Sequence, residues 1–546
     1  MELAVQRDPT HSTSEPNRCW TLTNMSEATP DVLTPMCWSL WTPLGELGAR
    51  RAWHELGLLP RSMVRLPADV NGFVMAPFYG RQAINVDLLA TLMGALPGTS
   101  RQDVERDFMG TVRSDAPSDR APSGRLPFIL LRAPLVLARL DSRVGALYTD
   151  QLEWWRRDVF HRGQPDGQAL LVAARDRFLA AMTLHAHGRF LSQAVQGAIL
   201  KLAASAGAGH LATGLYSGFG GVAETAVAED LWELSRDRLT EHEFLSRHGF
   251  HGHDEGNVSG VPWRSDPAPI RALATTLAGR TEASRPRLRE QAAQRQRQAA
   301  EQELRELLPR SRRPAVAALG RLARRQIRCV ERTKAAFLMA IDGARAAGTL
   351  LGPELVAAGR VHEPADALFL TIPELLGDPF PDSAELATFR RGLRDHYRTL
   401  TVPTTWVGTP TPADDTPVHP VSPTVGESFK ADLVIGAPGS SGEVTGRARV
   451  ITRLDEAYAL DEGEILICRH TDPAWVVAMS LADALVIDIG AASSHGAIVA
   501  RELGIPCVIG TGDGTDRIRT GDLVAVDGTR GEVRILERQT SPELSG

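Results

Sequence analysis

Residues 490–510 read GAASSHGAIVARELGIPCVIG, and the one histidine of this stretch, His495, lies where two sequence patterns meet. Residues 484–487 (ALVI) form a short apolar run that is typical of a buried strand, and this run ends before Gly490. After His495, apolar residues recur at helical spacing until residues 504–506 (GIP), a glycine-proline combination that ends helices. The sequence therefore places His495 at a corner between a strand and the first turn of a helix.

Such a corner is suited to hold an anion. The first backbone N–H groups of a helix have no partner within the helix, and Ser493 or Ser494 can serve as its N-cap. In a neutral imidazole one ring nitrogen has a lone pair that can attack phosphorus, while the other can donate a hydrogen bond that fixes the ring. We therefore expect His495 to be the catalytic residue and to carry a phosphoryl group.

The segment 494–502, SHGAIVARE, with the GIP that follows it, resembles the phosphohistidine motif of the phosphoenolpyruvate (PEP)-utilising enzymes. This family includes phosphoenolpyruvate synthase, pyruvate phosphate dikinase, rifampicin phosphotransferase and phenylphosphate synthase. In the family the histidine is phosphorylated and then passes the group on, which divides one difficult transfer into two easier steps. One departure is Ala491, which stands where the family usually has a second glycine.

The resemblance also implies which residues surround the histidine. Ser494 precedes it, and Arg501 lies on the same predicted helix. Thr471 opens the segment 471–475 (TDPAW), which resembles a loop that precedes a short helix in the family. We expect Ser494, Thr471 and Arg501 to bind the phosphate or to orient His495.

Residues 430–537 are predicted to form a compact carrier domain, followed by a tail over 538–546. Alternating apolar residues and paired glycines indicate strands joined by tight turns, and the order of the motifs resembles the swivelling β/β/α domain of the family. Residues 401–429, in front of this domain, are rich in proline and threonine and lack an apolar period, so we expect a linker. If the 25 residues 401–425 are extended at about 3.1 Å per residue, they can span on the order of 75 Å, enough for the domain to travel between two sites.

The rest of the chain has the pattern of a helical body. Residues 1–30 are polar, and we expect them to be poorly ordered. We interpret residues 31–400 as a helical acceptor-binding domain, because apolar residues recur at three- and four-residue spacing over stretches such as 167–202. The arginine-rich segment 285–334 has interleaved glutamates, so it indicates two amphipathic helices separated near 309–314 rather than an RNA-binding arm. The predicted fold class is a multidomain chain with a largely α-helical N-terminal and central body and a C-terminal swivelling β/β/α phosphohistidine domain.

A segment rich in glycine and histidine interrupts the helical pattern over residues 241–267. It resembles the family's glycine-rich loop: Glu255, Trp263 and Arg264 match that pattern, whereas His251 stands where relatives more often have arginine. Because polar loops set against helices often bind ligands, we expect these four residues to contact the phosphoryl acceptor. The neighbouring histidines leave open a metal site or a purely structural loop, although we predict no bound metal.

The composition excludes several classes of protein. The 546 residues suffice for about three domains. With 60 Lys+Arg against 66 Asp+Glu and a net charge of -6, the chain lacks the basic field that nucleic-acid binding requires. Five scattered cysteines without CxxC spacing favour a reducing, cytoplasmic location over a disulfide framework. The sequence shows neither the pattern of a leader peptide nor an unbroken apolar run of membrane-spanning length, so we expect no membrane association.

The resemblance implies a phosphotransferase with a phosphohistidine intermediate. Relatives that act alone carry an ATP-grasp domain or a PEP-binding barrel, but outside the carrier domain we find no glycine-rich phosphate loop with a lysine. The layout is similar to rifampicin phosphotransferase-like proteins without the ATP-grasp domain, and to split systems such as phenylphosphate synthase. We expect the phosphohistidine-carrying and acceptor-binding component of an ATP-dependent small-molecule phosphotransferase. A separate ATP-grasp protein would bind ATP and Mg²⁺, and this chain itself is expected to bind no cofactor.

Two alternatives stay open. A condensing ligase of the prodigiosin-synthase type resembles this family and would release phosphate while joining two molecules. A non-catalytic phosphocarrier subunit would be phosphorylated on His495 without turnover of a small molecule. The tryptophans of the body would suit an aromatic or hydrophobic acceptor, whose identity the sequence leaves open.

Overall fold

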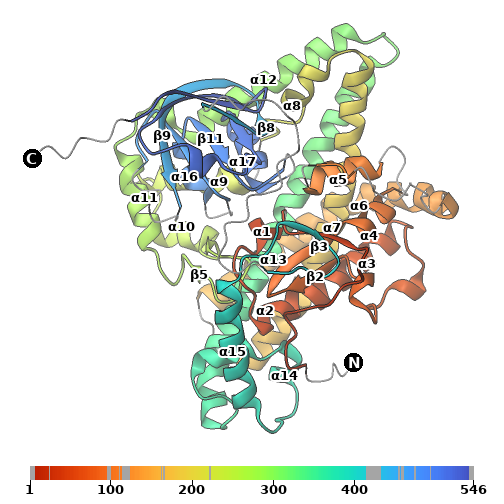
Figure 1. The fold of residues 1–546 in the computed structure, drawn as a ribbon, viewed down its shortest axis with the longest axis vertical. Helices are drawn as coiled ribbons and strands as arrows, with labels where there is room; N and C mark the ends of the chain where they lie inside the picture. The colour runs from red at the N-terminus through yellow and green to blue at the C-terminus, as the bar shows by residue number, and fades with distance from the viewer. Residues whose placement is uncertain are drawn as a thin grey trace, which may run out of the picture.

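The protein has two parts, a helical body and a sheet-rich C-terminal domain that lies against the body beside α8, α9 and α12 (Figure 1). The structure, a computed structural model, describes residues 6–23, 25–94, 100–109, 111–113, 123–161, 163, 166–220, 223–412, 432–452, 456, 460–471, 475–491 and 494–539. We refer to residues 432–539 as the C-terminal domain. The prediction of a multidomain chain with a helical body and a β-rich C-terminal region is confirmed at this level.

Two long helices form the centre of the body. Helix α7 (Gly167–Ser205) and helix α13 (Arg313–Ala357) run antiparallel and in contact, since Gly167 packs against Leu351 and Gly188 against Val330. As predicted, the arginine-rich segment forms two helices, and the first is α12. The other α-helices described in the body are α1 (Met25–Ala28), α2 (Pro35–Ser39), α3 (Gly45–Glu55), α4 (Val86–Met93), α5 (Arg101–Met109), α6 (Leu126–Trp154), α8 (Ala212–Leu215), α9 (Ala223–Leu234), α10 (Glu241–His248), α11 (Ala268–Ala278), α12 (Pro286–Leu307), α14 (Ile372–Leu376) and α15 (Ser383–Thr399).

Aromatic side chains hold the core of the body together. The ring of Trp41 lies edge-on to those of Phe178 and Phe337, with centroids 5.7 and 5.5 Å apart. Such pairs add about 0.5–1.5 kcal/mol beyond the burial of their area. The Trp41 indole N–H also donates to the Gly256 carbonyl at 2.8 Å, so the core ties down the loop that follows α10. No helix in the described residues has both the length and the apolar character needed to cross a membrane.

A small antiparallel sheet joins the two ends of the body. Its order is β2 (Met75–Phe78), β3 (Arg81–Asn85), β1 (Cys19–Thr21) and β6 (Thr405–Val407). The structure differs here from the expectations of poor order over 1–30 and of a linker over 401–429. Trp20 and Trp406 explain the difference. Both are buried and pack edge-on against Phe78, although the sequence around each of them is mostly polar. Residues 413–429 of the expected linker lie outside the described residues.

The C-terminal domain is built on one eight-stranded sheet. Its order is β7-β14-β13-β9-β10-β11-β12-β8, and the four strands from β9 to β12 run parallel. Alternate residues of β10 and β11 face two different apolar clusters, because side chains in a strand point to opposite faces in turn. The strands are β7 (Leu433–Ile435), β8 (Ala437–Ser440), β9 (Glu443–Ile451), β10 (Glu464–Cys468), β11 (Ala484–Ile487), β12 (Cys507–Ile509), β13 (Leu523–Asp527) and β14 (Glu532–Glu537), and the helices are α16 (Val476–Leu481), α17 (His495–Leu503) and α18 (Gly514–Arg517).

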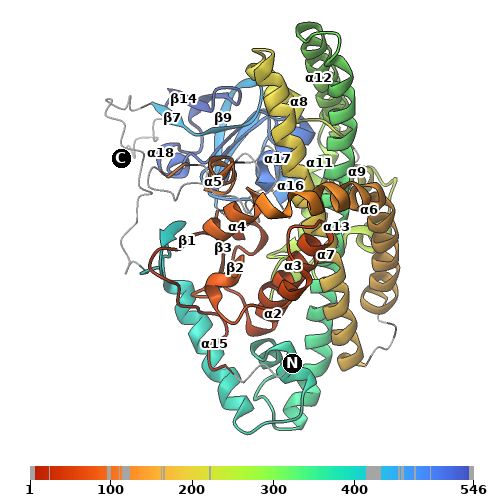
Figure 2. The ribbon, with the colours of Figure 1, turned by 90° about the vertical axis from the view of Figure 1, so that its right-hand side faces the viewer.

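The C-terminal domain is docked on the body through an apolar interface, and Figure 2 shows this domain beside α8 and α12. One continuous cluster of buried residues contains Leu231 and Trp263 of the body together with Trp475, Ala497 and Leu503 of the domain. Polar contacts surround this cluster. The guanidinium of Arg289 on α12, for example, donates to the Ala482 carbonyl at 2.6 Å and to the Asp483 carboxylate at 2.9 Å.

Candidate functional site

His495 is the first residue of α17 and follows the loop that leaves β11. This is the strand-to-helix corner that the sequence predicted. Gly490 is required there, because a Cβ atom at this position would lie 2.5 Å from Ile509 Cδ1 and 2.7 Å from Ser494 Oγ. The loop residue Ala491 is 1% exposed and takes part in closing the corner through its backbone.

Ser494 occupies the N-cap position of α17 but acts differently from a capping serine. Its hydroxyl donates to the Ala491 carbonyl at 2.8 Å and accepts the Ala491 N–H at 3.0 Å. Within the described residues no side chain caps α17, so the N–H groups of its first turn are not occupied by Ser494. These N–H groups and the positive end of the helix dipole favour an anion next to His495. The other predicted cap, Ser493, lies outside the described residues.

Thr471 lies against the same turn. It follows β10, the parallel neighbour of β11, so both chain segments leave the sheet at the same edge. A Cβ atom on Gly496 would be 2.7 Å from Thr471 Oγ1, which places this hydroxyl beside the residue that follows His495. Thr471 is fully buried, and among the described residues its Oγ1 has no hydrogen-bond partner. A buried hydroxyl of this kind is available to a group carried by His495.

Arg501 lies at the other end of α17. Six residues separate it from His495, which corresponds to about 9 Å along the helix axis and a different side of the helix. Its guanidinium donates to the Gly439 carbonyl at 2.9 Å, and burial lowers its pKa. The structure therefore does not place Arg501 beside His495 in this docked arrangement.

The four residues expected to contact the acceptor lie together in the loop between α10 and α11, which contains the hairpin β4 (Gly252–His253) and β5 (Val261–Pro262). His251 Nδ1 is 2.7 Å from Glu255 Oε2, and both residues are buried. The backbone N–H of Trp263 donates to the His251 carbonyl at 2.7 Å, and the centroids of the two side-chain rings are 5.6 Å apart. Within the described residues Glu255 Oε1 has no hydrogen-bond partner, which leaves one acceptor of this pair unused.

Arg264 has a structural partner. Its guanidinium binds the Asp342 carboxylate with two hydrogen bonds of 2.7 and 2.8 Å, and Trp155 and Arg345 donate to the same carboxylate. Burial alone would raise the pKa of Asp342, but the two arginines and the indole outweigh it and hold the pKa below its usual value. Arg264 thus anchors the loop to α13. In the described residues no group of three or more His, Cys, Asp or Glu side chains is placed to hold a metal ion.

The loop approaches the docked domain. Trp263 belongs to the shared apolar cluster. Burial lowers the pKa of His470, and the neighbouring Arg469 and His253 of the β4–β5 hairpin lower it further. The structure therefore brings the expected acceptor loop to the side of the body that faces His470 and Thr471.

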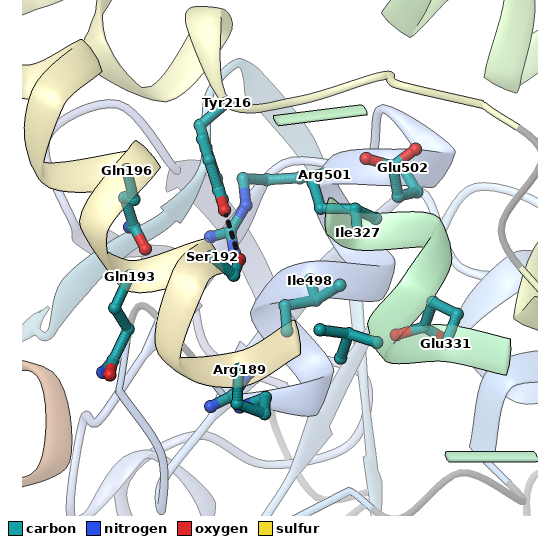
Figure 3. A pocket seen from close by; sticks show the side chains of 11 residues that line it. Arg189, Ser192, Gln193, Gln196, Tyr216, Ile327, Glu331, Ile498, Arg501 and Glu502 are labelled. Carbon is teal, nitrogen blue, oxygen red and sulfur yellow. Dashed lines mark hydrogen bonds between the residues drawn. The ribbon is translucent and has the colours of Figure 1, made fainter. Parts of the chain in front are cut away.

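A small pocket with a cavity volume of about 30 Å³ lies between the body and α17 (Figure 3). Helix α7 contributes four polar side chains, α13 contributes Ile327, Val330 and Glu331, and α17 contributes residues such as Ile498. Ile498 is one helical turn after His495. Sequence reasoning missed this pocket, because its walls come from segments that are far apart in the chain and each wall reads as an ordinary helix.

Comparison with known proteins identifies two regions of the chain. Residues 460–531 match the PEP-utilising enzyme mobile domain, and residues 238–331 match the rifampicin phosphotransferase fourth domain. Most of the C-terminal domain is therefore similar to the mobile domain of the PEP-utilising enzymes. The resemblance expected from the SHGAIVARE segment is confirmed, and the second match includes the loop between α10 and α11.

Individual relatives agree with this assignment. The chain is 45% identical over 121 residues to a phosphoenolpyruvate synthase of Aeropyrum pernix, which covers 20% of this chain and 15% of that protein. It is 40% identical over 110 residues to a rifampicin phosphotransferase of Bacillus cereus, covering 20% and 13%. It is also 35% identical over 156 residues to an uncharacterized phosphotransferase of Bacillus subtilis, covering 28% and 19%. The chain therefore spans less than a fifth of the length of these relatives.

Proposed function

We propose that this chain is the phosphohistidine-carrying and acceptor-binding component of an ATP-dependent small-molecule phosphotransferase, and that a separate ATP-grasp protein supplies the phosphoryl group. The observation that carries the proposal is the docking of α17. The helix that begins at His495 packs on the body, within a cluster that includes Trp263 of the region similar to the rifampicin phosphotransferase fourth domain. This packing supports the proposal, because it brings the helix that begins at His495 next to the region in which we expect the acceptor to bind.

The local geometry supports the first half-reaction. A ring nitrogen of neutral His495 attacks the phosphorus of the donor, so an N–P bond forms as the donor's P–O bond breaks and its electron pair leaves with the nucleotide. The phosphoryl group then lies at the positive end of α17, where backbone N–H groups can bind its oxygens. The Thr471 hydroxyl, buried against Gly496, is placed to donate a further hydrogen bond or to orient the ring.

In the second half-reaction the acceptor attacks phosphorus. The P–N bond breaks, and its electron pair returns to the imidazole of His495. We place acceptor contacts in the loop between α10 and α11, where the Glu255 carboxylate holds His251 by Nδ1 and leaves Nε2 as the ring nitrogen for other contacts. Arg264 then acts as a positioning residue, because its guanidinium is bound by Asp342.

The test is a search for acid-labile phosphate on His495 by mass spectrometry. The full chain is incubated with ATP and Mg²⁺, with and without a co-encoded ATP-grasp protein, and His495→Asn serves as the control. We expect phosphate on His495 only when the partner is present, followed by its transfer to a small molecule. Labelling with ATP alone would contradict the need for a partner, and equal labelling of the control would contradict the role of His495. A joined product with released phosphate would favour the condensing ligase.

A further inference from the structure

Helix α6 has apolar side chains on two opposite faces. On its inner face Leu140 and Val144 are buried in one cluster with Leu184 of α7 and Cys329 of α13. On its outer face, over residues 126–138, every exposed side chain is apolar. This outer face, which we call the apolar stripe, consists of two prolines, an alanine and the large side chains of Leu126, Phe128, Leu130, Leu131 and Leu135.

The apolar stripe is strongly exposed to solvent. Its five large side chains are 39–69% exposed, and Leu131 is the most exposed of them. Single exposed apolar residues are common on protein surfaces, but these follow each other over about 20 Å of one helix. A helix that is apolar on all sides is normally covered on all sides, and contiguous exposed apolar surface marks a contact with another molecule. The outer face of α6 therefore has the character of an uncovered interface.

The protein holds the apolar stripe in place before any partner binds. The Arg125 guanidinium donates to the Gly57 carbonyl at 3.0 Å and lies over the ring of Phe128, 4.5 Å from its centroid. Two turns later, the Arg132 guanidinium donates to the His54 carbonyl at 3.0 Å. These contacts tie α6 to the end of α3 and to the turn that follows it. A partner thus meets a surface that is already ordered, which lowers the entropic cost of binding.

The charges beside the apolar stripe argue against a second copy of the chain as its occupant. Residues 123–140 contain three arginines and no acidic residue. Arg139 at the end of the stripe is exposed, and its guanidinium makes no ion pair or hydrogen bond with the described residues. An antiparallel copy that covered the whole stripe would bring its own Arg125 next to Arg139, and Asp141 would lie beyond the end of the pairing. Because like charges repel, the stripe favours a different protein that offers a carboxylate.

An anionic membrane fits the apolar stripe less well. Binding of a helix at a membrane surface gains from several cations that can reach the lipid headgroups. Of the three arginines, Arg125 and Arg132 already donate to backbone carbonyls, so Arg139 alone offers an uncommitted guanidinium. A single cation suits one carboxylate of a protein partner better than it suits a charged lipid surface.

We propose that the apolar stripe of α6 is the docking surface for the separate phosphoryl-donor protein, which covers it with an apolar face and places a carboxylate at Arg139. This inference rests on the proposed function, which requires such a partner. The stripe measures about 20 by 10 Å, so it forms the apolar core of a wider contact of about 800 Å² per partner. Figure 1 shows α6 and the C-terminal domain on different sides of the body, so a donor bound here leaves the docked domain uncovered.

The test measures binding of the full chain to the co-encoded ATP-grasp protein by sedimentation velocity. Leu131→Glu places a charge at the centre of the stripe and should weaken binding at least about tenfold, the effect of losing one interface anchor. Arg139→Glu should weaken binding at least about tenfold through like-charge contact, and it keeps the test decisive if Leu131→Glu unfolds. The matched control is Leu350→Glu, which changes a leucine of α13 that is 43% exposed and should leave binding unchanged.

Labelling of His495 separates this proposal from the proposed function. At a saturating concentration of the ATP-grasp protein, Leu131→Glu should be labelled at the wild-type rate, while the half-saturating concentration rises as binding weakens. Binding with the expected sensitivity but without labelling would support the docking surface and contradict the carrier function. Labelling with an affinity that neither variant changes would overturn the docking surface and support the carrier function.

Three other results would overturn the docking surface. The first is a wild-type chain that does not bind the ATP-grasp protein. The second is self-association of the wild-type chain that Leu131→Glu abolishes, which would assign the stripe to a second copy. The third is flotation of the wild-type chain with phosphatidylglycerol vesicles that Leu131→Glu abolishes, which would assign it to a membrane.

Discussion

Removal of the Glu502 carboxylate should weaken the docking of the C-terminal domain on the body. Glu502 lies on the last turn of α17, and its two carboxylate oxygens accept the N–H groups of Phe219 and Gly220 at 3.2 and 3.0 Å. The side chain is 2% exposed in the docked state. In Glu502→Ala both N–H groups lose their partner inside the interface, whereas water can satisfy them when the domains separate.

The size of the effect follows from these two hydrogen bonds. A hydrogen bond to a charged group contributes about 1.5–3 kcal/mol, and the cost of burying the carboxylate offsets part of the total. We expect a net loss of about 2 kcal/mol of docking free energy, which corresponds to about a 30-fold shift in the docking equilibrium. Glu502→Gln keeps one acceptor oxygen and avoids the cost of burying a charge, so its docking should stay close to that of the wild type.

Amide hydrogen exchange measures the shift, because α17 and residues 212–220 become exposed when the domains part. Exchange there should rise about 30-fold in Glu502→Ala, while the buried strands β10 and β11 keep their protection. Glu537→Ala, which removes an exposed carboxylate of the same domain, is the matched control. Exchange within twofold of the wild type in Glu502→Ala would refute the role of Glu502 as the docking anchor.

The same residue gives docking a pH dependence with a defined sign. Burial raises the pKa of Glu502 in the docked state, so this state binds the proton more tightly than the separated state does. Docking is therefore strongest below the usual pKa of an exposed glutamate and weakens as the pH rises through the raised value. Glu502→Gln should remove this contribution, and an unchanged pH profile of exchange in that variant would contradict the assignment.

Three further predictions concern the fold and the site. Gly496→Ala would place a methyl carbon 2.7 Å from the Thr471 hydroxyl, so labelling of His495 should fall at least about tenfold, whereas Gly145→Ala, which meets no atom within 4 Å, should leave labelling intact. Asp342→Asn leaves the buried Arg345 and the partly buried Arg264 without their counter-charge and should cost about 3–5 kcal/mol in urea unfolding. Because the pKa of Asp342 is lowered, its contribution is present above the usual aspartate pKa and is lost as the pH falls through the lowered value, and the variant should lack this acid sensitivity. Burial raises the pKa of Cys37 to about 12, so iodoacetamide at pH 8 should modify it only after unfolding, and rapid modification of the native protein would contradict this environment.

The strands and the helix around His495 could be predicted well, because each is indicated by residues that lie close together in the sequence. The apolar run 484–487, the helix after His495 and the strand at 507–509 appear in the structure within one residue of their expected positions. An apolar run and a glycine-proline stop act within one or two turns of chain, so a single sequence reports them. The helix of residues 167–202 was equally accessible for the same reason.

Long-range partners were not accessible in this way. Arg501 was expected near the phosphate because it belongs to the motif that contains His495, but its partner, Gly439, is 62 residues away. The pairing of Cys19–Thr21 with Thr405–Val407 also joins segments that carry no shared pattern. The pocket arises only when α17 meets α7 and α13. A charged residue at position 189 indicates a solvent-exposed helix face as readily as a pocket wall, so the local sequence does not distinguish the two.

Helix α17 links the chemistry to docking. His495 begins this helix and Glu502 occupies its last turn, about 10 Å apart along a rod that does not bend over this length. When Phe219 and Gly220 hold Glu502, the position of His495 relative to the body is therefore fixed as well. In the docked state the histidine can reach only groups on this side of the body. If the proposed carrier function is correct, a phosphoryl donor on another protein requires release of the Glu502 contact, so conditions that strengthen docking should favour transfer to the acceptor and oppose reloading of His495.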